Sequence, residues 1–267
     1  MIRTWKITKA RLDELRFEDS SSLDAVTRQL PDGYYSTFRT YDSCTRVIGL
    51  SAHLRRLPNA DASFLRRNLI RLLDPYRPGE ARIRVVQTRR RQFYISIEPL
   101  KPLPRKIYET GVRVETTNLQ RDDPRVKSTV FISSSDEERK HIAKAGILEA
   151  LLVKNGKILE GMTSNFFYIV ERDTIPLYIG TAQRGILLGV TRTMVLRAAR
   201  GRGVAVRYRA LKLDQLSRVK EAFITSSSRG IVPVVQIDEL VLGGVGDVTR
   251  MLMTAYEEYV LKHAERI

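Results

Sequence analysis

The sequence contains very little cysteine and histidine, and both shortages limit its chemistry. Cys44 is the only cysteine, which excludes an intramolecular disulfide and a metal site built from a cysteine cluster. The three histidines, His53, His141 and His263, are too scattered to give a metal-ligand spacing. We therefore expect no bound metal.

Long apolar runs are also missing. No window reaches the roughly eighteen uncharged apolar residues that a membrane span requires, and residues 1–15 lack the apolar centre of a signal peptide. We expect a cytoplasmic protein. Gly-x-Ser-x-Gly, the Walker phosphate loop and Gly-x-Gly-x-x-Gly after a strand are absent too, so a serine-hydrolase elbow, ATP and nicotinamide cofactors have no motif to support them.

Positive charge is abundant: the 267 residues carry a formal charge of +16. This excess is compatible with a nucleic-acid surface, with attraction for anionic small molecules, or with an arginine-rich solvated exterior. The longest basic run, Arg89 to Arg91, separates two strand-like segments, which predicts a hairpin tip. No nucleic-acid-binding motif accompanies it.

The hydrophobic pattern predicts an α/β (α+β) protein with two domains. In the first part we expect strands at 32–42, 45–50, 81–88, 92–100 and 112–117, and helices at 51–57 and 60–76. A polar stretch with Pro124 follows and predicts a connector. We accordingly divide the chain into an N-terminal domain (1–115), a connector (116–125) and a C-terminal domain (126–267).

The second part combines helices and short strands. Ser135 and Glu138 form a capping-box signature for a helix that ends near Gly146. Strands are expected at 147–153, 157–159, 165–170, 204–210, 221–227 and 231–238, and helices from the 189–195 segment to Gly201 or Gly203 and at 246–264.

A polar insert interrupts an otherwise apolar strand pair. After the Asn155-Gly156 turn and the apolar "KIL", the sequence reads Glu160-Gly-Met-Thr-Ser-Asn165 before the apolar "FFYIV". A carboxylate at a buried strand end needs a cationic or protonated partner. The alternative is that Glu160 is the exposed start of a hairpin strand.

Two segments have the composition of an anion-binding site. The helix start at 189–195 offers unpaired N–H groups and the Thr191 hydroxyl, unless Thr191 is only an N-cap. The segment 225–230, "TSSSRG", offers hydroxyls at a strand end, unless it is only a serine-rich turn. Together with Lys127 and Glu160, these two segments meet the needs of pyridoxal 5'-phosphate. The cofactor requires an amine from a lysine, a carboxylate for its ring nitrogen and a cup of donors for its phosphate.

These segments, in this order, resemble the class IV aminotransferases, the fold-type IV pyridoxal-phosphate enzymes. That family includes branched-chain aminotransferases, D-amino-acid aminotransferases and 4-amino-4-deoxychorismate lyases. The markers are "SAHLRRL", "RVKST", "ILEALLVKNGKILEGMTSNFF", "GILLGVTR" and "EAFITSSSRGIVPV", and the similarity runs over residues 32–256. The resemblance implies a small N-terminal α/β domain, a larger C-terminal domain with a barrel-like sheet, a cofactor at their interface and a homodimer.

The resemblance also implies roles for particular residues. Lys127, which precedes Glu160 by 33 residues, would form the Schiff base with pyridoxal phosphate and move the substrate proton. Glu160 would pair with the pyridine nitrogen, and Asn165 would anchor the loop, with a simple turn residue as the alternative. The expected phosphate ligands are Arg56, Val190, Thr191 and Ser227.

Three further residues match the family's substrate side. Ser228 lies where relatives present backbone donors to the substrate carboxylate, and Arg39 matches an arginine that lines the cleft. Tyr35 occupies an aromatic position near the substrate. For Arg39 a structural ion pair is the alternative, and for Tyr35 it is core packing. Ile132 stands where branched-chain enzymes have a tyrosine, so the contact to the ring hydroxyl is unassigned.

The function that follows is transfer of an amino group between an amino acid and a 2-oxo acid. The nearest alternative is the lyase reaction that gives 4-aminobenzoate and pyruvate with the same cofactor and lysine. A more distant one is a non-catalytic, basic nucleic-acid-binding protein on the same scaffold.

Overall fold

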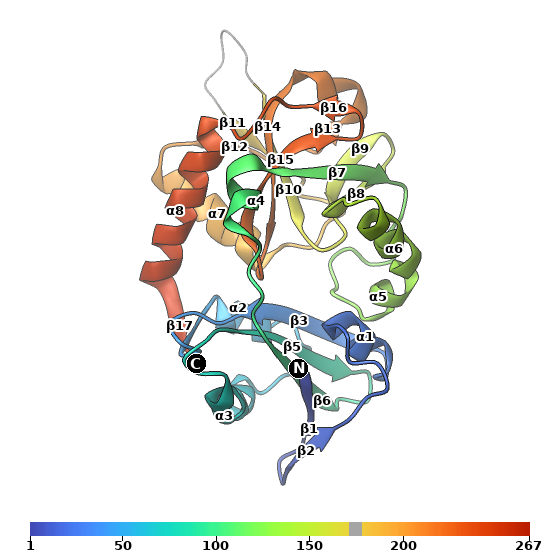
Figure 1. Cartoon of the computed structure of the whole chain (residues 1–267), viewed down its shortest axis with the longest axis vertical. Coiled ribbons are helices and arrows are strands. Elements are labelled where there is room, and N and C mark those ends of the chain that lie inside the picture. The colour runs from blue at the N-terminus through green and yellow to red at the C-terminus, as the bar shows by residue number, and fades with distance from the viewer. Residues whose placement is uncertain (171–177) are drawn as a thin grey trace. The chain divides into compact units, whose positions relative to one another are not determined.

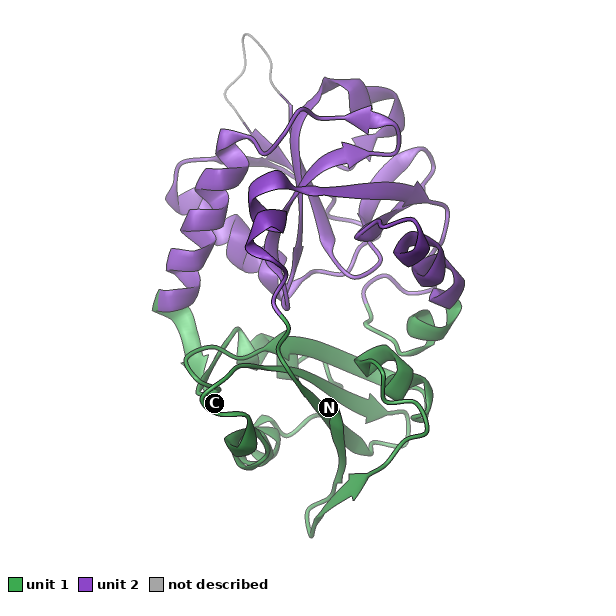
Figure 2. Cartoon of the chain, viewed as in Figure 1, with its two compact units in different colours: residues 1–101, 126–134, 262–267 green, residues 102–125, 135–261 purple. Residues whose placement is uncertain are grey.

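Segments far apart in the sequence come together in the first of two units. The computed structural model describes residues 1–170 and 178–267. Unit 1 comprises residues 1–101, 126–134 and 262–267, and unit 2 comprises residues 102–125 and 135–261 (Figure 2).

Unit 1 is built on an antiparallel five-stranded sheet with the order β2-β1-β6-β5-β3 (Figure 1). Its strands are β1 (Arg3–Ile7), β2 (Leu12–Leu15), β3 (Gly33–Arg39), β5 (Ala81–Thr88) and β6 (Phe93–Pro99), and a separate pair joins β4 (Arg46–Ile48) to β17 (Ala264–Arg266). Its helices are α1 (Leu23–Arg28), α2 (Leu50–Leu54), α3 (Ala62–Leu73), η1 (Asp74–Tyr76) and α5 (Val130–Ser134).

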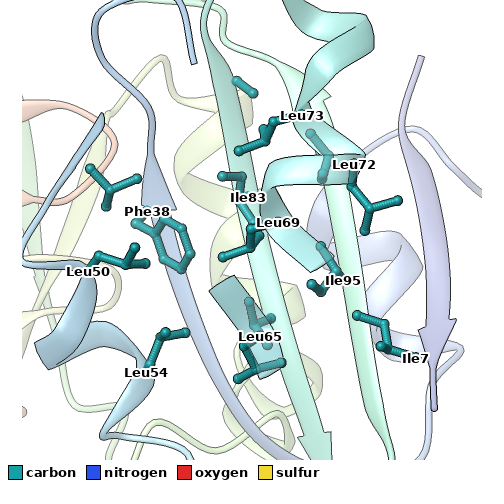
Figure 3. Packing of buried hydrophobic residues seen from close by; sticks show 14 of the residues in the cluster. Ile7, Phe38, Leu50, Leu54, Leu65, Leu69, Leu72, Leu73, Ile83 and Ile95 are labelled. Atoms are coloured by element: carbon teal, nitrogen blue, oxygen red, sulfur yellow. The ribbon is translucent and has the colours of Figure 1, made fainter. Parts of the chain in front are cut away.

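The core of unit 1 lies between helix α3 and the sheet. Leu65, Leu69 and Leu73 recur at helical spacing, are almost fully buried, and pack with Ile83 and Ile95 (Figure 3). The exposed tip of the β5–β6 hairpin carries the three arginines at 89–91, as predicted. These contacts hold β5, and through it β3, in a fixed place.

The edge strand β3 fixes the position of Lys127. The backbone N–H of Tyr35 donates to the carbonyl of Lys127 at 2.9 Å, and the N–H of Thr129 donates to the carbonyl of Gly33 at 2.9 Å. A Cβ at Gly33 would lie 2.0 Å from the Gln87 carbonyl oxygen, so glycine permits the close approach of β3 to β5 at this point. The lysine is therefore attached to a sheet edge rather than carried on a loose loop.

Unit 2 contains a closed barrel. Strands β10, β14, β15, β7, β8 and β9 pair in that order, and β9 pairs again with β10 through Glu160 and Asn165 (Figure 1). The barrel strands are β7 (Val112–Thr117), β8 (Glu149–Lys154), β9 (Lys157–Gly161), β10 (Asn165–Val170), β14 (Val219–Ser226) and β15 (Gly230–Ile237). The two polar residues singled out in the sequence thus close the barrel.

The remaining elements include strands that extend the barrel sheet, together with helices. They are α4 (Arg105–Thr110), α6 (Asp136–Lys144), β11 (Tyr178–Gly180), α7 (Val190–Gly201), β12 (Ala205–Arg207), β13 (Leu211–Lys212), η2 (Leu213–Arg218), β16 (Leu240–Val241) and α8 (Asp247–His263). Helix α7 packs against β12 and β14. The predicted α/β class with a barrel-like sheet is confirmed.

The two units divide the chain at other points than the sequence suggested. Residues 102–115 belong to unit 2 rather than to the first domain, because β7 pairs in parallel with β8 and β15. Residues 126–134 belong to unit 1, because residues 127–129 pair with β3. The capping box was also wrong: Ser135 precedes α6 but makes no cap hydrogen bond, and its hydroxyl accepts from Arg139 Nε at 3.0 Å.

Candidate active site

The Glu160 carboxylate is buried and tightly bound within unit 2. Its side chain is 3% exposed. Oε1 accepts a hydrogen bond from Arg121 Nε at 3.1 Å, and Oε2 accepts from the Leu187 N–H at 3.1 Å and from Asn165 Nδ2 at 3.2 Å. The alternative of an exposed strand start is therefore excluded. Three donors therefore compensate the burial of this carboxylate.

Arg121 is the cation that compensates this buried charge. Its side chain is 5% exposed, and Nη2 donates to the Met162 carbonyl at 2.5 Å. The sequence motifs assign no role to residue 121, which lies in the predicted connector, whereas the structure pairs it with Glu160. No local pattern identifies an ion pair between positions 121 and 160. The one sequence feature that points to it is an arginine within a polar stretch.

A second buried carboxylate, Glu149, shapes the polar insert. Its Oε2 accepts from Thr163 Oγ1 at 2.5 Å, from Ser164 Oγ at 2.9 Å and from Arg229 Nη2 at 3.3 Å. A Cβ at Gly161 would lie 2.3 Å from Ser164 Oγ, so a side chain there would displace the Ser164 hydroxyl from its place beside Glu149. The insert is thus a fixed turn that sets Glu160 and Asn165 opposite each other.

Asn165 connects the carboxylate to the start of helix α7. Its Nδ2 also donates to the Leu187 carbonyl at 2.7 Å, and Gly189 is the N-cap residue. Thr191 lies inside the helix, so the interpretation of Thr191 as an N-cap was wrong. Instead, its buried Oγ1 lies 3.1 Å from Ser227 Oγ, which brings the two predicted anion-binding segments together. Val190 is the first residue of α7 and is buried.

We expect Gly189→Ala to disrupt the site while Gly201→Ala does not. A Cβ at Gly189 would lie 2.0 Å from Asn165 Oδ1, whereas one at Gly201, on the same helix, meets nothing within 4 Å. The first change should lower the free energy of unfolding by about 1–3 kcal/mol, and the second should raise it by about 0.5–1 kcal/mol. Urea unfolding of both variants measures this. Equal effects would contradict the close packing around Asn165.

The turn after β14 carries Ser227 and Ser228, both half-buried. The N–H of Arg229 donates to the Ser226 carbonyl at 3.3 Å, which makes the segment a tight turn between β14 and β15. Ser227 therefore acts both as a turn residue and as the partner of Thr191. The two interpretations of this segment are compatible.

In unit 1, the Lys127 amine lies over the ring of Tyr35, with Nζ 4.7 Å from the ring centroid. Tyr35 is 5% exposed and packs in a cluster with Val86, Tyr94 and Ile132, so it is a core residue as well as a neighbour of the lysine. Ile132 fills part of this cluster, which explains why the position accepts an apolar side chain.

Arg84 fixes the same tyrosine ring. Its guanidinium carbon lies 4.8 Å from the Tyr35 centroid, and its side chain is held by an ion pair with Asp24 at 2.6 Å and a hydrogen bond to Thr37 Oγ1 at 3.0 Å. Cations over an aromatic face are attracted to it. Tyr35 therefore has little freedom to move away from Lys127.

Arg39 and Arg56 occupy different surroundings. The Arg39 guanidinium stacks over Tyr41 at 4.7 Å and donates from Nε to the Thr40 carbonyl at 3.3 Å. Within residues 1–170 and 178–267 Arg39 has no carboxylate partner, so the alternative of a structural ion pair gains no support. Arg56 follows helix α2 and is half-buried.

The imidazole of His53 is buried near the positive charges of Arg56 and Lys127. It is 1% exposed, and Nδ1 lies 2.8 Å from Ser36 Oγ. Burial, and then the charges of Arg56 and Lys127, hold the pKa of His53 well below 6.5. The side chain is therefore neutral in the folded protein at neutral pH.

We expect His53 to make the protein less stable in mild acid. The unfolded chain binds a proton at His53 below about pH 6.5 while the folded chain does not, so stability is present above that pH and is lost as pH falls. The loss should approach about 1.4 kcal/mol per pH unit. Urea unfolding at pH 7.5 and 5.5 should show a smaller acid loss for His53→Gln than for wild type.

The donor set fits pyridoxal phosphate. Unit 2 supplies a buried carboxylate paired with Arg121 and a hydroxyl pair at a helix N-terminus, and its N-cap glycine leaves no room for a side chain. Unit 1 supplies a lysine amine over an aromatic ring. Within residues 1–170 and 178–267, no three His, Cys, Asp or Glu side chains are grouped as a metal site requires.

Comparison with known proteins agrees with this donor set. The family model described as "Amino-transferase class IV" matches residues 33–237. The chain therefore belongs to the class IV aminotransferase family, a family of enzymes that use pyridoxal phosphate. The family, the fold and the enzyme class expected from the sequence motifs are confirmed.

Several relatives share the length of the chain. A "Putative branched-chain-amino-acid aminotransferase" from Methanocaldococcus jannaschii is 29% identical, covering 85% of this chain and 86% of its own. A "D-alanine aminotransferase" from Bacillus licheniformis is 27% identical, with coverages of 89% and 91%. An "Aminodeoxychorismate lyase" from Bacillus subtilis is 24% identical, with 85% of each chain covered.

A solved structure gives the same picture of the fold. The crystal structure of a putative branched-chain amino acid aminotransferase from Thermotoga maritima aligns with a TM-score of 0.78 and 26% identity. It covers 97% of this chain and 96% of its own.

Among the described residues, no helix is long and apolar enough to span a bilayer.

Proposed function

We propose that this chain transfers an amino group between an amino acid and a 2-oxo acid with pyridoxal phosphate as its cofactor. The observation that carries the proposal is the buried Glu160 carboxylate, bound by Arg121, Asn165 and the Leu187 N–H beside the start of α7. A carboxylate held in this way is an acceptor for a protonated ring nitrogen. Family membership supports the same function.

When bound, pyridoxal phosphate supplies an aldehyde that joins an amine and a ring that accepts electrons. Lys127 provides the amine that holds the cofactor and carries the proton removed from the substrate Cα. Tyr35 and Arg84 restrict the place of that amine. Glu160 would accept a hydrogen bond from the protonated ring nitrogen, and Asn165 and Arg121 orient its two oxygens.

Other residues bind the ends of the cofactor and substrate. We assign the phosphate to Arg56, to the backbone at Val190 and to the hydroxyls of Thr191 and Ser227. Two observations support this assignment. The Thr191 and Ser227 hydroxyls lie 3.1 Å from each other, and Thr191 is in the first turn of α7. Ser228, Arg39 and Tyr35 are the proposed substrate contacts.

A half-reaction tests the proposal. The protein loaded with pyridoxal phosphate is mixed with single L- and D-amino acids, and the absorbance of the bound cofactor is followed. A transaminase should convert the cofactor to its amine form with an amino acid alone, and a 2-oxo acid should reverse the change.

Two other results would overturn this function. Unchanged absorbance with every amino acid, together with formation of 4-aminobenzoate from aminodeoxychorismate, would identify the lyase. Failure to bind the cofactor, together with nucleic-acid affinity that falls steeply with salt, would identify the binding protein.

We further propose a cytoplasmic homodimer. The homodimer is supported by the similarity over nearly the whole chain to a branched-chain aminotransferase fold. A cytoplasmic location is supported by the single, buried, unpaired Cys44. Light scattering of the purified protein and cell fractionation test these two points separately.

A further inference from the structure

Thr225, near the end of β14, has an unused hydroxyl in the interior of unit 2. The residue is 2% exposed, and within residues 1–170 and 178–267 its Oγ1 has no hydrogen-bond partner. A hydroxyl buried without a partner destabilises the folded chain, and such groups are uncommon in native proteins. A ligand that provides the missing partner would remove this cost.

The strand register places Thr225 on the same barrel face as the Glu160 carboxylate. Glu160 of β9 is directly opposite Asn165 of β10, and Asn165 is directly opposite Thr225 of β14. Directly opposed residues of antiparallel strands project from the same face of the sheet. The three side chains therefore form one row across three neighbouring strands.

The row connects the two ends of the proposed cofactor site. At one end, Asn165 Nδ2 bonds Glu160 Oε2 at 3.2 Å, next to the position assigned to the ring nitrogen. At the other end, Thr225 stands two residues before Ser227, whose hydroxyl contacts Thr191 at the start of α7. The unpartnered Thr225 hydroxyl therefore shares a barrel face with the first group and precedes the second by two residues.

We propose that the Thr225 hydroxyl hydrogen-bonds to bound pyridoxal phosphate. This inference rests on the proposed function and adds a residue that the sequence motifs did not assign. The lack of a partner distinguishes Thr225 from other buried threonines of unit 2, whose hydroxyls already make hydrogen bonds. Thr181, for example, is 1% exposed and donates to the Phe166 carbonyl at 2.9 Å.

The test compares Thr225→Val with Thr181→Val. Valine has nearly the same shape as threonine and carries a methyl group in place of the hydroxyl. In the cofactor-free protein, Thr225→Val should raise the melting temperature or leave it unchanged, whereas Thr181→Val should lower it. In titrations with pyridoxal phosphate, Thr225→Val should bind about tenfold more weakly than wild type, and Thr181→Val should bind as wild type does. Thr225→Ser, which keeps the hydroxyl, should recover the affinity.

The outcomes separate this inference from the proposed function. Wild-type protein that fails to bind pyridoxal phosphate would overturn both. Wild-type binding with equal affinity in Thr225→Val would overturn only the role of Thr225. A lower melting temperature of cofactor-free Thr225→Val, matching that of Thr181→Val, would show that the hydroxyl has a structural partner and would also overturn it.

Discussion

Lys127→Ala should abolish transamination and covalent cofactor attachment while leaving the fold intact. No other group in the proposed site combines a primary amine with the position that the family motif requires, so loss of both nucleophile and proton carrier should cost at least about 10³-fold in turnover. Borohydride reduction followed by peptide mass spectrometry should find the cofactor on the peptide containing residue 127 of wild type. The variant should carry none.

The structure explains why this variant should remain folded. The attachment of residue 127 to β3 uses its backbone carbonyl, which alanine keeps, and the lost side chain contacts the Tyr35 ring. Lys127→Arg is the sharper variant, because arginine keeps the charge over the ring but provides no amine for attachment. Lys140→Ala, on the exposed face of α6, is the matched control and should behave as wild type. Turnover by Lys127→Ala near the wild-type rate would exclude the assigned role.

The sequence predicts most strands and helices because their information is local. Alternating apolar residues identify β5 and β6, helical spacing identifies α3, and the left-handed residues Asn155 and Gly156 form the turn of the β8–β9 hairpin. The motif order also selects Glu160 and Asn165. Their opposite placement at the seam of the barrel follows from the strand pairing, which a linear motif does not reveal.

What the sequence does not predict depends on pairing over long distances. The ion pair of Arg121 with Glu160 joins a polar connector to a strand end 39 positions later. Likewise, β17 follows a helix with a regular apolar pattern, but residues 264–266 pair with β4 more than 200 positions earlier. Tertiary contacts decide both cases, as they do for the unit boundaries at residues 102 and 126.

A cap that the sequence predicts is replaced for a related reason. The Ser135 hydroxyl accepts from Arg139 on the next turn instead of capping α6. The burial and register of Thr225, on which its proposed role depends, likewise follow from the fold and not from the segment's composition. Local chemistry identifies which groups can bond. The fold determines which of them do.

Glu160→Ala should cause a large loss of stability, which Lys127→Ala does not, and the largest loss of activity after Lys127→Ala. Its removal leaves the Arg121 guanidinium, with a side chain only 5% exposed, without the carboxylate that compensates its charge. Breaking one partner of a buried ion pair costs about 3–5 kcal/mol of the free energy of unfolding. The ring nitrogen of the cofactor would also lose its acceptor, and turnover should fall by about 10²–10³-fold.

The structural and chemical parts of this effect are separated by the double variant Glu160→Leu with Arg121→Met. Apolar side chains of similar volume often replace a buried ion pair at little cost, so urea unfolding should show most of the stability restored. Turnover should stay as low as in Glu160→Ala, because no acceptor for the ring nitrogen returns. If turnover recovers together with stability, Glu160 serves only to hold the barrel seam, and the assignment of the ring nitrogen to it fails. Low stability in the double variant would instead show that the hydrogen bonds from Asn165 and Leu187, rather than the ion pair, dominate the energetics of this carboxylate.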